Sequence, residues 1–201
     1  MTDRLPATVE GIARAATLLA AGAVVAFPTD TVYGVAVAAS RPDRLSALFE
    51  LKRRPLDRLI PILVADLAQV GGEWVVDERA QRLVERFWPG PLTLVLSSTD
   101  GSRTQAFRAP DHPVALALIQ AAGPLLATSA NVSDEPDTGS ADDVSIAFAT
   151  QQDELAAVVD GGSVPGGRSS TVLDLSVAPA RILREGPIRR EDLAEAIELA
   201  R

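Results

Sequence analysis

The chain has 201 residues with 47% hydrophobic and 23% charged side chains, proportions that exclude a disordered or collagen-like protein. It contains no cysteine and one histidine, which excludes disulfide bridges, a thiol nucleophile and cysteine- or histidine-rich zinc sites. Its 27 acidic and 19 basic side chains give a net charge of −8, which disfavours stable binding to nucleic acid. The length predicts one domain over residues 1–201. With no signal-peptide pattern and no apolar run of membrane-spanning length, a cytoplasmic protein is expected.

Helical spacing and short β-rich runs alternate along the chain, which predicts an α/β fold. In chain order we expect a helix over 8–21, a strand over 23–27, a loop over 28–34, a helix from 40 to the basic segment at Lys52, a strand over 59–65, a helix over 77–87 and a strand over 92–97. The second half continues with a helix over 113–122, strands over 125–128, 155–159, 170–175 and 181–184, and a closing helix from 190. Residues 161–167 are predicted to form a flexible glycine-rich loop.

Three polar segments follow or precede predicted strands, at residues 29–34, at 129–131 and just before Ser170. In open α/β sheets, ligands bind where strands end in such loops. The pattern therefore predicts that the three segments converge on one cleft.

Four cations stand within seven positions, at Lys52, Arg53, Arg54 and Arg58, in a chain that is otherwise acidic. One interpretation is a solvated helix end, where cations complement the negative end of the helix dipole. The other is a clamp for a polyphosphate. Lys52 is the only lysine beside 18 arginines, and a compact ammonium is not interchangeable with a planar guanidinium at a close-contact site. We expect Lys52 to be partly exposed and its replacement to leave the fold intact.

Asn131 and Tyr33 are also single in the chain, and, like lysine, both are encoded by A/T-rich codons. Their scarcity indicates a GC-rich genome, so the survivors mark positions where chemistry resists substitution. Ser129 and Asn131 share one face of an extended segment, although serine and asparagine are also common in turns and caps. His112 precedes a predicted helix, where capping or packing is favoured over catalysis.

Seven strings occur in order along the chain: PTDTVYG, KRRP, FWPGPLTLVL, RAPDHP, TSANVS, SSTVLD and ILREG. Together they resemble the Sua5/YciO/YrdC family, the threonylcarbamoyl-AMP synthases, from about Leu18 to Gly186. The family signature KxR…SxN is matched by Lys52 and Arg54 in its first part and by Ser129 and Asn131 in its second, and these four are the expected catalytic residues.

This resemblance implies an α/β fold with a twisted, mixed, mostly parallel sheet flanked by helices around a large ligand cleft, as one domain without the second domain of the longer family form. It implies a nucleotidyltransferase that condenses L-threonine, bicarbonate and ATP, with Mg²⁺, to threonylcarbamoyl-AMP and pyrophosphate. The product would pass to a separate tRNA threonylcarbamoyl transferase complex, which modifies adenosine 37 of tRNA. Threonine carbamate is itself a nucleophile, so a chain without cysteine is suited to this reaction.

The same resemblance implies roles for individual residues. The ATP-binding set is Lys52, Arg54, Arg58, Ser129, Asn131, Asp137 and Arg184, and the threonine-binding set is Thr31, Arg108 and Ser170. No protein-held metal site is expected.

The sequence also departs from the family pattern. Arg58 and Leu59 stand where asparagine or lysine and then proline are common, and Leu63 stands where longer members carry a histidine near threonine. Asp134 replaces a usual glycine, and Asp137 replaces a small polar residue that often contacts the nucleotide. A carboxylate beside a triphosphate is repulsive unless Mg²⁺ intervenes or the loop points away.

Two alternatives stay open at this point. One is a paralogue of the YciO type, with the same fold and altered chemistry. The other is a module that binds nucleotide or double-stranded RNA without turnover, against which the acidic balance argues. Carbamoyl transfer of the hydrogenase-maturation kind is disfavoured because it needs further domains and zinc-binding cysteines.

Overall fold

The computed structural model describes residues 2–53, 60–133, 135–151, 153–165 and 168–200. The strands are β1 (Asp3–Pro6), β2 (Val24–Pro28), β3 (Tyr33–Ala38), β4 (Ile62–Leu63), β5 (Leu92–Ser97), β6 (Thr104–Arg108), β7 (Leu125–Ser129), β8 (Leu155–Asp160), β9 (Thr171–Asp174) and β10 (Arg181–Arg184). The α-helices are α1 (Val9–Ala20), α2 (Leu45–Lys52), α3 (Glu78–Phe87), α4 (Pro113–Ala122), α5 (Ala141–Ala147) and α6 (Arg190–Ala194). Two 3₁₀ turns, η1 (Pro42–Arg44) and η2 (Leu67–Val70), complete the elements.

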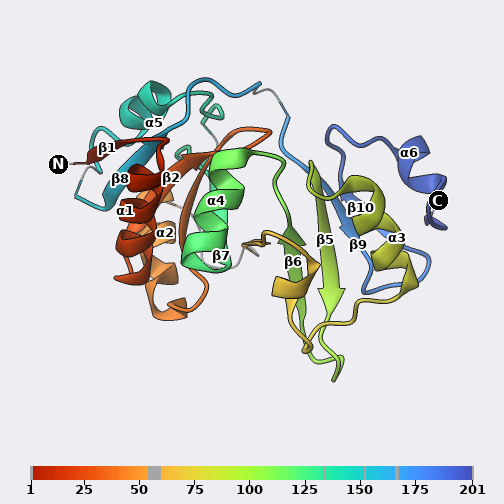
Figure 1. Ribbon diagram of the computed structural model, residues 1–201. Coiled ribbons are helices and arrows are strands. Elements are labelled where there is room, and N and C mark those ends of the chain that lie inside the picture. The colour runs from red at the N-terminus through yellow and green to blue at the C-terminus, as the bar shows by residue number, and fades with distance from the viewer. Residues whose placement is uncertain (1, 54–59, 134, 152, 166–167, 201) are drawn as a thin grey trace.

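The strands form one 10-stranded sheet in the order β1-β8-β2-β3-β7-β4-β6-β5-β9-β10. Figure 1 shows β1 with the N-terminus at one end and α6 with the C-terminus at the other. The α/β class and the mixed sheet are confirmed, but the expected majority of parallel pairs is wrong. Of the described neighbouring pairs, four are parallel and five are antiparallel. Three of these antiparallel pairs join successive strands that return directly, β2–β3, β5–β6 and β9–β10, and the other two place β7 against β3 and β4.

Helices cover both faces of one part of the sheet, which we call the covered half and define as β8, β2 and β3. Alternate residues of a strand point to opposite faces. Val25 and Phe27 of β2 accordingly pack with α1 and α4, whereas Val24 and Ala26 pack with α2 and α5. Every residue of β2 and β3 is buried as a result.

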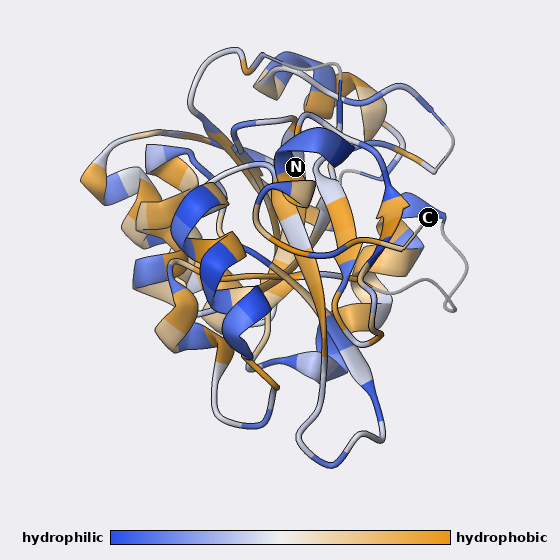
Figure 2. Ribbon diagram, turned by 90° about the vertical axis from the view of Figure 1, so that its right-hand side faces the viewer, coloured by the Kyte–Doolittle hydropathy of each residue, from blue (hydrophilic) through white to orange (hydrophobic). Residues whose placement is uncertain are grey.

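The other part of the sheet, which we call the open half and define as β6, β5 and β9, packs against helices on one face. Leu92, Leu94 and Leu96 of β5 join a core with α3 and α6. The residues between them, Thr93 and Val95, line a cavity on the opposite face. In Figure 2 hydrophilic and hydrophobic stretches alternate along the helices, while hydrophobic colour predominates along the strands.

Most predicted elements are confirmed within one or two residues. The helix over 113–122 and the strand over 181–184 have the predicted bounds, and Thr8 caps α1 as its side chain accepts a hydrogen bond from the Gly11 amide. Elements that sequence reasoning missed are β1, β3, β6 and α5. Strand β3 was hidden because YGVAVA is buried on both faces, so its sequence has no polar alternation.

Two predicted elements are shorter than expected, and the closing helix begins at its predicted residue. The loop over 28–34 is reduced to four residues because Pro28 ends β2 and Tyr33 begins β3. The strand over 59–65 is β4, two residues long in the described part, and the closing helix α6 has five residues. The glycine-rich loop is held near its start, where the hydroxyl of Tyr33 donates to the carbonyl of Gly162 (2.7 Å).

Candidate functional site

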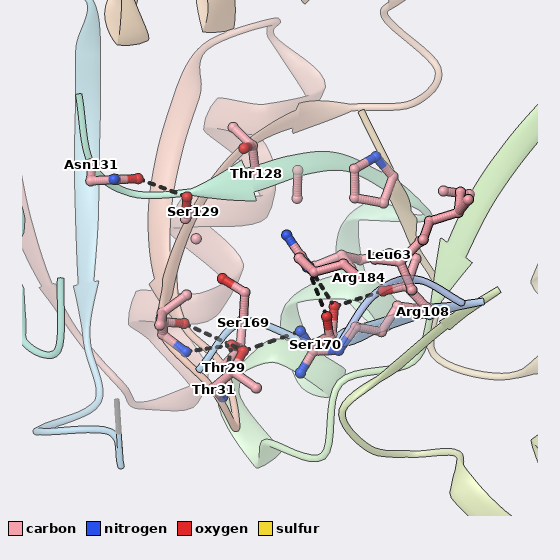
Figure 3. Close-up of a pocket in the computed structure, with 18 of the residues that line it drawn as sticks. Thr29, Thr31, Leu63, Arg108, Thr128, Ser129, Asn131, Ser169, Ser170 and Arg184 are labelled. Carbon is pink, nitrogen blue, oxygen red and sulfur yellow. Dashed lines mark hydrogen bonds between the residues drawn. The ribbon is translucent and has the colours of Figure 1, made fainter. Parts of the chain in front are cut away.

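A cavity of about 410 Å³ lies where the two halves of the sheet meet, a size in the range of small-molecule sites. All three predicted polar segments contribute to its wall, so the expected convergence is confirmed. The lining includes seven predicted site residues: Thr31, Lys52, Arg108, Ser129, Asn131, Ser170 and Arg184. In Figure 3 Ser129 and Asn131 lie at one side of the cavity, and Arg108, Ser170 and Arg184 lie together at another.

Lys52 joins the end of α2 to the segment after β7. Its Nζ donates to the backbone oxygens of Ser129 (2.5 Å) and Asn131 (2.7 Å) and to Oδ1 of Asn131 (3.1 Å). The Asn131 Oδ1 also accepts from the hydroxyl of Ser129 (2.7 Å), and its Nδ2 donates to the carbonyl of Glu135 (2.6 Å). Lysine, serine and asparagine thus form one hydrogen-bonded unit, which joins the two parts of the signature.

This geometry corrects the expectation that Lys52 is partly exposed. The residue is 3% exposed, and its ammonium lies against three oxygens that belong to one short segment. Buried polar groups that lose such partners are costly. Replacement of Lys52 is therefore expected to disturb the position of Ser129 and Asn131 as well as the charge of the cavity.

Arg108 forms a second polar unit at the end of β6. Its Nη2 donates to Oδ1 of Asp30 (2.5 Å), its Nη1 to the hydroxyl of Thr31 (3.1 Å) and its Nε to the carbonyl of Gly90 (3.1 Å). The hydroxyl of Thr29 lies 3.1 Å from that of Thr31 and accepts from the Thr31 amide (3.2 Å), which fixes the turn between β2 and β3.

Burial lowers the pKa of the Arg108 guanidinium, and the nearby charge of Arg184 lowers it further, whereas Asp30 raises it. The intrinsic basicity of arginine is so high that the side chain keeps its charge. Two arginines, Arg108 and Arg184, therefore face one cavity, and Arg108 is paired with the carboxylate of Asp30. Such an arrangement is suited to an anionic ligand.

Ser170 joins Arg184 to the open half of the sheet. Its hydroxyl is 2.8 Å from that of Thr93 and accepts from Nη2 of Arg184 (3.2 Å), while Nε of Arg184 donates to the Ser170 carbonyl (3.0 Å). Burial lowers the pKa of Arg184, and the charge of Asp137 partly opposes this. These contacts place Arg184, which comes from the edge strand β10, at the cavity wall (Figure 3).

Leu63 also lines the cavity, from β4, and is 5% exposed. Its side chain belongs to the core formed with α1 and α4. The wall contributed by β4 is therefore apolar at this position.

Asp137 lies in a neighbouring pocket of about 460 Å³, which Arg53 and Gln151 also line. The hydroxyl of Ser169, a residue of the main cavity, donates to Oδ2 of Asp137 at 3.5 Å. Asp137 thus borders the main cavity from the neighbouring pocket. Four positions singled out in the sequence, Arg54, Arg58, Leu59 and Asp134, lie outside the described residues.

His112 caps α4, since its Nδ1 accepts from the amide of Val114 (3.3 Å). Burial lowers the pKa of His112, although the charges of Asp30 and Asp111 raise it. The predicted capping role is confirmed.

Sequence reasoning missed Thr93, and it placed Asp30 in the polar segment 29–34 without giving it a role. Thr93 gave no signal because threonine is an ordinary strand residue. Its role is visible only in the fold, where it lies on the face of β5 that borders the cavity, the face that we call the bare face of β5. Asp30 stands inside the string PTDTVYG, where its partner at position 108 is invisible without the fold.

No group of three or more histidine, aspartate or glutamate side chains is arranged to hold a metal ion in the part of the chain that the structure describes. Among the same residues, no helix is long and apolar enough to cross a membrane.

A profile of the Sua5/YciO/YrdC family, described as telomere recombination, matches residues 17–186. The chain belongs to this family. The resemblance carried by the seven strings is therefore confirmed.

Two curated relatives within this family are threonylcarbamoyl-AMP synthases. That of Bacillus subtilis is 39% identical over 98% of this chain and 59% of its own length, and that of Pyrococcus abyssi is 38% identical over 91% of this chain and 56% of its own length. The chain thus spans a little over half of these relatives. The crystal structure of P. abyssi Sua5 complexed with L-threonine superimposes with a TM-score of 0.87, at 33% identity, over 100% of this chain and 62% of that one.

Proposed function

We propose that this chain condenses L-threonine, bicarbonate and ATP to threonylcarbamoyl-AMP, with release of pyrophosphate and water. The observation that carries the proposal is that one cavity brings the Lys52–Ser129–Asn131 unit together with Thr31, Arg108, Ser170 and Arg184. The activity for which both curated relatives are named, and the L-threonine complex of P. abyssi Sua5, support it.

The chemistry requires alignment and charge neutralisation more than a protein nucleophile. Bicarbonate and the amine of threonine give a carbamate with loss of water, and a carbamate oxygen then attacks the α-phosphorus of ATP as pyrophosphate leaves. Two anions must meet, so a cavity with several cations and hydrogen-bond donors lowers the barrier. The described residues supply these groups without a cysteine or a catalytic histidine.

The threonine end of the site is assigned to Thr31, Arg108 and Ser170. A guanidinium binds a carboxylate through two parallel hydrogen bonds, which suits Arg108 to the carboxylate of the amino acid. The hydroxyl of Thr31 accepts from Arg108, and that of Ser170 accepts from Arg184 in the same cavity.

The nucleotide end is assigned to Lys52, Ser129 and Asn131, together with Arg184 from the cavity wall and Asp137 from the neighbouring pocket. Arg54 and Arg58 complete this assignment from the sequence. Mg²⁺ would arrive as part of the Mg–ATP substrate. Its charge would offset the repulsion between the phosphates and the carboxylate of Asp137. A separate tRNA threonylcarbamoyl transferase complex would then take the adenylate for modification of tRNA at adenosine 37.

The test is release of pyrophosphate by purified protein supplied with ATP, Mg²⁺ and bicarbonate, with and without L-threonine. We expect release only in the complete mixture, and a threonine- and AMP-containing product by mass spectrometry. Folded protein that binds ATP by calorimetry but releases no threonine-dependent pyrophosphate would contradict the proposal and favour a binding module or an altered substrate.

A further inference from the structure

Asp30 lies next to the cavity but is not among the residues that line it. Its neighbours Thr29 and Thr31 line the cavity, while the Asp30 carboxylate meets Arg108. The side chains of this ion pair are 9% exposed for Arg108 and 13% exposed for Asp30. The guanidinium therefore has the cavity on one side and a carboxylate of its own protein on another.

The donors of Arg108 can be counted. A guanidinium has five N–H groups. One from each nitrogen donates within the protein, to Asp30, Thr31 and Gly90. Among the described residues these are its hydrogen bonds, so one N–H on each terminal nitrogen remains for a ligand. Two N–H groups on neighbouring nitrogens match the two oxygens of a carboxylate.

We propose that Asp30 is a positioning residue, which holds the guanidinium of Arg108 in the orientation that binds the carboxylate of the amino-acid substrate. This inference rests on the proposed function. Without the carboxylate, rotation about the last side-chain bonds of Arg108 is restrained at Nε and Nη1 alone. An arginine that is not held in place loses affinity for its ligand because binding must then order it.

Asp30 also sets the charge balance at this end of the cavity. Arg108 and Arg184 both face the cavity and repel one another. The Asp30 carboxylate offsets one of the two charges, and its charge also raises the pKa of His112, which burial lowers. Removal of Asp30 leaves a buried guanidinium without its counter-ion, which favours movement of the arginine toward water or toward any anion that enters the cavity.

Two substitutions separate the geometric role from the electrostatic one. Asp30→Ala removes both the oxygen acceptor and the charge, while Asp30→Asn keeps an oxygen that Nη2 of Arg108 can reach. In threonine-dependent pyrophosphate release, we expect Asp30→Ala to raise the KM for threonine at least about tenfold and Asp30→Asn about threefold. The KM for ATP should stay within about twofold of wild type in both variants.

A ligand without a carboxylate provides a readout that general destabilisation would not change. By calorimetry, the wild-type protein should bind L-threonine more tightly than L-threoninol, in which an alcohol replaces the carboxylate. Asp30→Ala should reduce this preference at least about fivefold. The matched control is Asp174→Asn, because Asp174 is 6% exposed, pairs with Arg181 and lies outside the cavity lining. It should keep the wild-type preference even if its melting temperature falls.

The possible failures are distinguishable. Wild-type protein that turns over threonine, beside a folded Asp30→Ala variant with unchanged threonine KM and unchanged preference over threoninol, would overturn the role of Asp30 alone. If Asp30→Ala does not fold, the same comparison is decided by Asp30→Asn. Wild-type protein that neither binds nor uses threonine would overturn the proposed function and the role of Asp30 with it.

Discussion

In both halves of the sheet, alternate side chains of a strand point to opposite faces. In the covered half both faces pack against helices, whereas in the open half one face packs against helices and the other borders the cavity. In β2 both sets of alternate residues are apolar, and each set meets a pair of helices. In β5 one set is apolar and packs with α3 and α6, while Thr93 and Val95 on the other face line the cavity. A face that lacks a helix must carry polar groups or hold a ligand, because bare apolar strands would be exposed to water.

The covered half contains strands buried on both faces, which stabilise the fold, whereas the polar residues of the site lie at the cavity. Buried polar side chains of the site lie where the halves meet: Thr31 after β2, Lys52 at the end of α2, Arg108 at the end of β6 and Ser170 before β9. The covered half, in which β2 and β3 are buried throughout, supplies the wall from which the loops emerge. A substitution in the covered half should therefore affect unfolding, and one on the bare face should affect substrates.

The largest effect on stability is expected from Phe27→Ala in the covered half. Phe27 is fully buried among residues of α1, α4 and the sheet, and its truncation leaves a cavity. The free energy of unfolding should fall by about 3–5 kcal/mol in urea titrations. Since Phe27 does not line the cavity, the KM values for threonine and ATP should remain within about twofold at a temperature where the variant is folded. A rise in the KM for only one of the two substrates would show that the covered half also affects substrate binding, which contradicts the proposed difference between the halves.

Lys52→Met tests the junction between the halves. The substitution keeps the length of the side chain but removes the donors to the Ser129 and Asn131 oxygens, so unfolding should cost about 1–3 kcal/mol less. Turnover should fall at least about a hundredfold, because the charge and the position of the Ser129–Asn131 segment are both lost.

Arg79→Met is the matched control for Lys52→Met. Arg79 also donates to a carboxylate and to backbone carbonyls, those of Asp77, Leu175 and Val177, but it lies outside the cavity lining. It should lose stability and keep turnover of the folded protein. Equal loss of turnover in the two variants would show that Lys52 acts only through stability.

Much of this arrangement could be predicted from residue patterns. Helical spacing located α1, α3 and α4, and His112 marked the start of α4, because those signals are local. The rarity of lysine and asparagine pointed to Lys52 and Asn131, and the structure joins these two residues by hydrogen bonds. The predicted convergence of three loops followed from a general property of strand ends.

What could not be predicted depends on contacts between distant residues. Partner choice between strands made the sheet more antiparallel than expected, since a run such as YGVAVA carries no information about its neighbours. The burial of Lys52 follows from the position of β7, 77 residues farther along the chain at Ser129. The pairing of Asp30 with Arg108 spans 78 residues and required the fold.

The smallest effect is expected from Thr93→Val on the bare face of β5. Valine keeps the shape of the side chain but removes the hydroxyl that lies 2.8 Å from that of Ser170, and Ser170 retains its bond from Arg184. The free energy of unfolding should fall by about 1 kcal/mol, and the KM for threonine should rise about threefold because Ser170 is less firmly held. The double variant Thr93→Val/Ser170→Ala should be less destabilised than the sum of the single changes, as both hydroxyls are then gone. Additive losses in that cycle, with threonine KM unchanged in Thr93→Val, would show that the polar face of the open half is unconnected to substrate binding.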